Sequence, residues 1–75
     1  MKITKGAFSR FTLPGRVKLV HQYGRFISSK IMEAKKIMLF KLCDFYVAII
    51  RDLVRNCVLE ANPVISQELL QFLIS

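Results

Sequence analysis

Residues 30–61 read KIMEAKKIMLFKLCDFYVAIIRDLVRNCVLEA, and this stretch decides which fold the chain is expected to adopt. It contains neither proline nor glycine, and its charged residues recur at spacings of about three, four and seven, as they do along one side of an α-helix. Apolar residues cover more than half of the helical circumference, which is more than a surface helix shows. The pattern therefore predicts one long central helix that is contacted on several sides.

Shorter elements are expected on both sides of this helix. Pro14 favours a helix start and Gly24 a helix end. Asn62 and Pro63 end the long helix, and Ser66 favours the start of a last one. The sequence therefore predicts an all-α fold of a short, a long and a short helix. The expected parts are a basic N-terminal arm (residues 1–13) and a single helical domain (14–75) with helices at about 15–23, 30–61 and 66–74.

The chain is short for the apolar surface that it carries. It has 75 residues, 53% of them hydrophobic, and a domain of this size buries only about 60% of the surface of its unfolded chain. Neither a disulfide nor a metal is expected to compensate, because Cys43 and Cys57 lie too far apart on one helix and His21 is the single histidine. We therefore expect a second chain to complete the core. The residues expected at that interface are Met38, Leu42, Phe45, Tyr46, Ile49, Ile50, Leu53, Leu69 and Phe72.

Positive charge is concentrated at the front of the chain. The formal net charge is +7, and the first 32 residues contain seven lysines and arginines but no acid. A surface of this kind attracts anions such as the phosphate groups of nucleic acids. The residues predicted to contact nucleic acid are Lys2, Lys5, Arg10, Arg16, Lys18, Arg25 and Lys30.

The order of the predicted helices resembles the histone fold. LPGRVKLV (13–20) resembles the opening of the first helix of that family, IIRDLVRN (49–56) the second half of its long helix, and VISQELLQFLI (64–74) its second loop and third helix. Within the family, the chain is most similar to core histones of the second-A type and to the gamma subunit of the CCAAT-binding nuclear factor.

The resemblance implies a partner and a role. In the histone fold, the long helix crosses that of a second histone-fold chain, either a second copy or a paralogue. Arg16, Arg25 and Lys30 match positions near phosphate contacts of the family. The second loop departs from the family, because residues 60–63 carry no basic side chain. The resemblance therefore implies a DNA-associated subunit that pairs through its long helix, in the nucleus or on chromatin.

Two other kinds of function stay open at this stage. The same basic front suits a small structural protein of an organellar ribosome or another RNA–protein complex, with a mitochondrial location. It also suits a subunit at an anionic membrane surface. A membrane span is not expected, because the apolar run 37–50 is interrupted by Lys41 and Asp44. No phosphate-binding loop, nucleophile motif or metal motif is present, so neither an enzyme nor a cofactor is expected.

Overall fold

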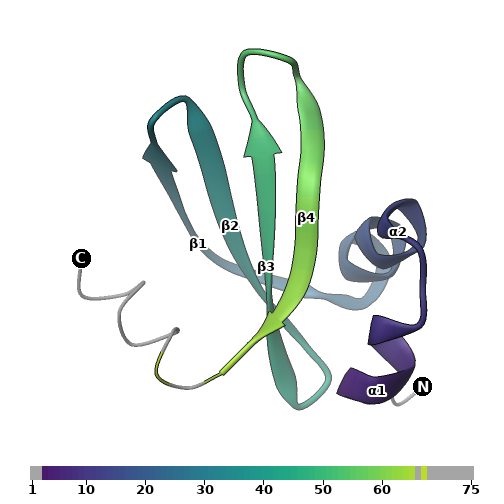
Figure 1. The fold of residues 1–75 in the computed structure, drawn as a ribbon. Coiled ribbons are helices and arrows are strands. Elements are labelled where there is room, and N and C mark those ends of the chain that lie inside the picture. Colours follow the sequence, from purple (N-terminus) through teal and green to yellow (C-terminus); the bar gives the residue numbers. More distant parts are fainter. Residues whose placement is uncertain (1–2, 66, 68–75) are drawn as a thin grey trace.

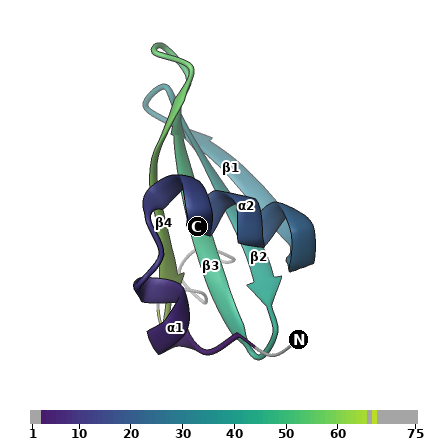
Figure 2. The ribbon, with the colours of Figure 1, turned by 90° about the vertical axis from the view of Figure 1, so that its right-hand side faces the viewer.

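The computed structural model describes residues 3–65 and 67, and it shows a small antiparallel sheet with two helices. The elements are α1 (Lys5–Ser9), α2 (Leu13–Tyr23), β1 (Arg25–Met32), β2 (Lys35–Leu42), β3 (Phe45–Asp52) and β4 (Cys57–Val64). The strands lie in the order β1-β2-β3-β4, and each pairs antiparallel with the next along the chain (Figure 1). Both helices cover the same face of the sheet (Figure 2).

The prediction of an all-α, histone-fold-like protein was wrong. Residues 30–61 form no long helix, because they contain the end of β1, all of β2 and β3, and most of β4. A run of apolar residues without glycine or proline is compatible with a buried helix and with buried strands, and periodicity alone does not separate the two. The run 45–50, FYVAII, consists almost entirely of aromatic, valine and isoleucine residues, which favour a strand.

The turns that divide this stretch are made without glycine. Glu33 and Ala34, between β1 and β2, both have positive φ (51° and 63°), as the two central residues of a type I′ hairpin turn do. Cys43, which opens the next turn, has a φ of 56°. None of these three residues is a usual sign of a hairpin, and Asp44, which follows Cys43, is the one common turn residue in the two turns.

The loop between β3 and β4 has a side-chain basis. The carboxylate of Asp52 accepts hydrogen bonds from the backbone N–H of Val54 (2.9 Å) and of Arg55 (3.1 Å). Aspartate often closes a turn in this way. Asn56 then adopts a φ of 56° and leads into β4, which brings the chain back beside β3.

The helices begin and end at residues suited to these positions. The side chain of Thr12 accepts a hydrogen bond from the N–H of Gly15 at the start of α2, and Thr4 does the same for α1. α2 occupies Leu13–Tyr23, where a helix over about 15–23 was expected. The expected arm, residues 1–13, contains α1. The expected last helix, residues 66–74, lies outside the described residues except for residue 67.

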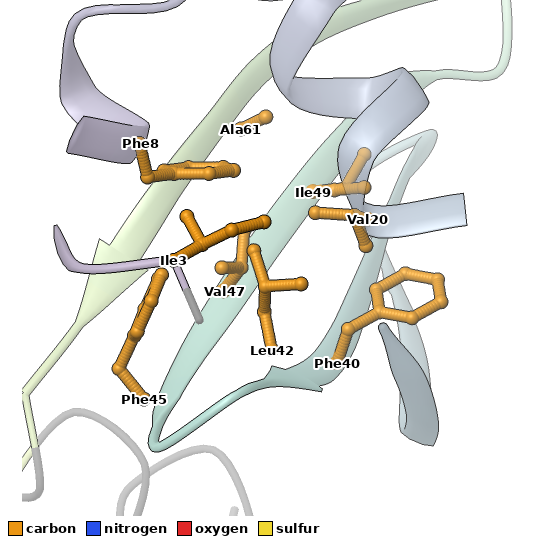
Figure 3. Packing of buried hydrophobic residues seen from close by; sticks show 9 residues of the cluster. All are labelled: Ile3, Phe8, Val20, Phe40, Leu42, Phe45, Val47, Ile49 and Ala61. Carbon is orange, nitrogen blue, oxygen red and sulfur yellow. The ribbon is translucent and has the colours of Figure 1, made fainter. Parts of the chain in front are cut away.

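The core lies between the helices and the sheet. Phe8 of α1 and Val20 of α2 point toward the strands, and both are fully buried (Figure 3). The rings of Phe8 and Phe45 meet edge to face, with centroids 5.8 Å apart. The buried hydrophobic cluster consists of Ile3, Phe8, Val20, Phe40, Leu42, Phe45, Val47, Ile49 and Ala61. One copy of the chain therefore forms a core with its own helices.

Candidate nucleic-acid interface

The two halves of the sheet differ in charge. Residues 25–42, which form β1, β2 and their turn, carry five cations and one acid, a net charge of +4; the charged residues are Arg25, Lys30, Glu33, Lys35, Lys36 and Lys41. Residues 45–64, which form β3, β4 and their loop, carry two cations and two acids, a net charge of zero; they are Arg51, Asp52, Arg55 and Glu60. We call residues 25–42 the cationic hairpin. It forms one edge of the sheet.

At one end of this hairpin two cations lie directly opposite each other. The register pairs Arg25 with Lys41, and Lys41 in turn with Tyr46 of β3. Phe40 and Val47, the neighbours of Lys41 and Tyr46 along their strands, point into the helix-side core. Because side chains alternate along a strand, the row of Arg25, Lys41 and Tyr46 faces the other way. We call this side of the sheet the helix-free face, since neither α1 nor α2 lies on it.

The Arg25–Lys41 pair has an electrostatic cost within the protein. Directly opposite residues of an antiparallel pair have Cβ atoms only about 4.5–5.5 Å apart, so like charges in these positions repel each other. Both side chains are exposed, and neither forms an ion pair within the described part of the chain. The ammonium group of Lys41 lies 5.9 Å from the centroid of the Tyr46 ring. An anion between the two cations would remove the repulsion.

The other cations of the hairpin have different surroundings. Lys35 is exposed, but the register places it opposite Asp52. Lys36 is half-buried and lies opposite Arg51, whose guanidinium donates a hydrogen bond to the side-chain oxygen of Asn56. Lys30 is half-buried within β1. Arg25 and Lys41 are therefore the two exposed cations of the hairpin that lie directly opposite each other.

Arg16, which was predicted to contact phosphate, is turned toward the protein instead. Its guanidinium donates four hydrogen bonds to other parts of the fold. The acceptors are the carbonyl oxygens of Phe11 (3.0 Å), Ser9 (2.7 Å) and Ala61 (3.2 Å) and the side-chain oxygen of Asn62 (3.1 Å). The guanidinium also lies 5.8 Å from the centroid of the Phe8 ring. Arg16 thus ties the segment between the helices to β4.

The remaining predicted nucleic-acid contacts are spread over two layers. Lys5 is exposed on α1, Arg10 just after it, and Lys18 on α2, so all three belong to the helix layer. Arg25 and Lys30 belong to β1 in the sheet layer. Lys2 lies outside the described residues. The fold therefore does not bring the predicted cations together into one patch.

Three cations of the hairpin were missed by the sequence reasoning, namely Lys35, Lys36 and Lys41. The predicted long helix places Lys36 and Lys41 on its polar stripe and gives Lys35 no role. The available signal was the division of the stretch into eight-residue segments by short connections, and it was weak because the two-residue turns at 33–34 and 43–44 contain neither glycine nor asparagine.

Four of the seven described residues of the predicted partner interface pack within the chain. Leu42, Phe45 and Ile49 lie in the core, and Met38 packs against it. Tyr46 and Ile50 are half-buried, and the strand alternation places them on the helix-free face. Leu53 is exposed in the loop after β3. Leu69 and Phe72 lie outside the described residues.

Other kinds of site find little support in residues 3–65 and 67. No enclosed cavity and no group of three or more metal-binding side chains occurs there. His21 is exposed, and its ring meets that of Phe40 edge to face, with centroids 5.9 Å apart. Neither described helix is long and apolar enough to cross a membrane. Comparisons with protein-family models, with curated proteins and with solved structures find no match to this chain.

Proposed function

We propose that this protein is a non-enzymatic RNA-binding protein that holds the phosphate backbone of RNA with its cationic hairpin. The observation that carries the proposal is the exposed pair of Arg25 and Lys41, directly opposite each other on neighbouring strands. A phosphate group bound by both side chains offsets a repulsion that the folded protein otherwise retains.

RNA fits this surface better than duplex DNA does. The expectation of DNA binding depended on a histone-like pair of chains, and the observed sheet does not provide that arrangement. Antiparallel sheets that bind single strands combine cations with an aromatic side chain on one face, and here Tyr46 stands beside Lys41. A small structural role in an RNA–protein complex agrees with this chemistry. The cellular location stays a prediction.

The proposal is tested by fluorescence anisotropy with a labelled 20-nucleotide single-stranded RNA and with duplex DNA of the same sequence. The Arg25→Gln/Lys41→Gln variant removes the pair. Each neutralised phosphate contributes about 0.7 to the slope of log K against log salt for single strands, so loss of the one phosphate held by both side chains should lower the slope by about 0.7. The matched control is Lys5→Gln/Lys18→Gln, which removes the same charge from exposed positions in the helix layer. This control should retain a slope near that of the unmodified protein.

Two results would contradict the proposal. If both double variants lose the same affinity and the same slope, the binding depends on net charge and not on the hairpin. If the unmodified protein binds duplex DNA more tightly than RNA at every salt concentration, the hairpin does not select a single strand.

A further inference from the structure

Exposed apolar side chains gather at one end of the sheet. The β1–β2 turn and the β3–β4 loop lie side by side there, because the N–H of Leu53 donates a hydrogen bond to the carbonyl oxygen of Ala34 (3.0 Å). Both connections project beyond α2 (Figure 2). We call residues 31–36 and 51–56 the sheet tip. Its large apolar side chains are between 42% and 80% exposed, and they are Ile31, Met32, Leu53 and Val54.

The apolar side chains of the sheet tip do not lie on one face. Ile31 and Met32 follow each other along β1, and because side chains alternate along a strand they point to opposite faces of the sheet. A protein docked on either face would cover only one of them. Four aliphatic side chains also supply at most about 500 Å², whereas a stable protein–protein interface buries about 800 Å² on each partner. A fluid partner that surrounds the end of the sheet covers all four.

The charges of the sheet tip indicate which fluid partner fits. It carries four cations and two acids, a net charge of +2; they are Lys35, Lys36, Arg51, Arg55, Glu33 and Asp52. The side chain of Arg55 is 79% exposed, whereas that of Asp52 is 17% exposed and accepts hydrogen bonds from the loop backbone. Lys35 and Glu33 are exposed as well. Each cation near an anionic lipid surface strengthens binding about fivefold.

We propose that the sheet tip inserts into the surface of a membrane that contains anionic lipids. The four apolar side chains enter the boundary between headgroups and acyl chains, and the long stems of Lys35 and Arg55 let their charges stay among the headgroups. The inference does not depend on RNA binding. Arg25 lies at the other end of β1 from Met32, about 23 Å away at the usual rise of a strand, so the two surfaces are separate.

Insertion is tested with a single introduced tryptophan, since the chain has none of its own. When vesicles of phosphatidylcholine and phosphatidylserine are added, the emission of Val54→Trp should shift to shorter wavelength, and brominated lipids should quench it. Tyr23→Trp is the matched control, because Tyr23 is 50% exposed but ends α2 at the far end of β1. Its emission should not change.

The apolar contribution is measured by sedimentation with the same vesicles. Ile31→Ser/Val54→Ser changes two exposed side chains, so the fold should persist, and vesicle affinity should fall about tenfold or more. The control Tyr23→Ser/Ile65→Ser also changes two exposed apolar residues, but away from the sheet tip, and it should keep the affinity of the unmodified protein. Ile31→Ser/Val54→Ser should bind RNA as the unmodified protein does, so a failure of either proposal is recognised separately.

Three results would overturn the insertion of the sheet tip. One is an unchanged emission of Val54→Trp with anionic vesicles at low salt. Another is an equal loss of vesicle affinity in the two double-serine variants. The third is self-association of the unmodified chain that Ile31→Ser/Val54→Ser abolishes, with no binding to vesicles, since this would assign the sheet tip to a second copy.

Discussion

Replacing Arg16 by lysine tests whether this side chain holds the fold together or serves as a free cation. The substitution keeps the positive charge and most of the aliphatic stem. It removes the planar fork of donors that reaches four acceptors in the helix segment and in β4. A lysine ammonium satisfies one of these acceptors and leaves the others to water. We therefore expect the folded state to lose stability without a change in net charge.

The expected loss follows from the surroundings of each hydrogen bond. Three of the four bonds are solvent-exposed, and each contributes about 0.5 kcal/mol, the low end of the usual range. The part-buried bond to the carbonyl oxygen of Ala61 contributes about 1.5 kcal/mol. Because lysine retains one bond, Arg16→Lys should reduce the free energy of unfolding by about 2 kcal/mol. For a domain of this size, that corresponds to a fall in melting temperature of about 8–16 °C.

The measurement is urea unfolding followed by circular dichroism, with thermal melting as a second probe. Arg10→Lys is the control, because Arg10 is exposed and its side chain forms no hydrogen bond within the described part of the chain. The control should stay within about 0.5 kcal/mol of the unmodified protein. A similarly small effect of Arg16→Lys would refute the reasoning that Arg16 ties the helices to β4.

Two further substitutions test the local geometry. Gly24→Ala should lower the free energy of unfolding by about 1–3 kcal/mol, because the new Cβ would lie 2.5 Å from the carbonyl oxygen of Val20. At Gly6 the atom nearest to a new Cβ is 4.0 Å away, so Gly6→Ala should be neutral or slightly stabilising. The melting temperatures of the two variants compare these outcomes directly. Glu33→Asn combined with Ala34→Gly should raise the free energy of unfolding by about 1 kcal/mol in urea titrations, since both positions have positive φ. A less stable double variant would show that the turn is not strained.

Part of the fold has clear signals in the sequence. Pro14 lies in the first turn of α2, where its fixed φ suits a helix, and Gly24 follows the last residue of α2. The backbone of Gly24 is extended, and a glycine fits there because a Cβ would lie 2.5 Å from the carbonyl oxygen of Val20. The strands were missed because residues 30–61 contain neither glycine nor proline and show long apolar runs. The hairpins form in spite of Glu33, Ala34 and Cys43 at positive φ. Pairing of the strands and burial against the helices therefore outweigh the local preferences of these residues.

The sequence predicts the position of α2 better than it predicts the candidate site. The net positive charge and the cations of the front of the chain were evident, and they directed attention to phosphate groups. Arg16 looked equivalent to Lys18 in the sequence, yet the first is held by four acceptors and the second is exposed. Only contacts between distant segments distinguish two such residues, and no local pattern contains that information.

The sequence by itself determined the charge of +7, the high apolar content and the small size. These properties predict an anionic partner and a core of marginal stability. The tertiary structure decided that the apolar stretch forms strands, and that Arg25 and Lys41 stand opposite each other. The physical reason is the register of the strands. Hydrogen bonds between β1 and β2 bring Arg25 and Lys41, which are 16 residues apart in sequence, directly opposite each other, and that register depends on a turn at Glu33 and Ala34 that has almost no local signal.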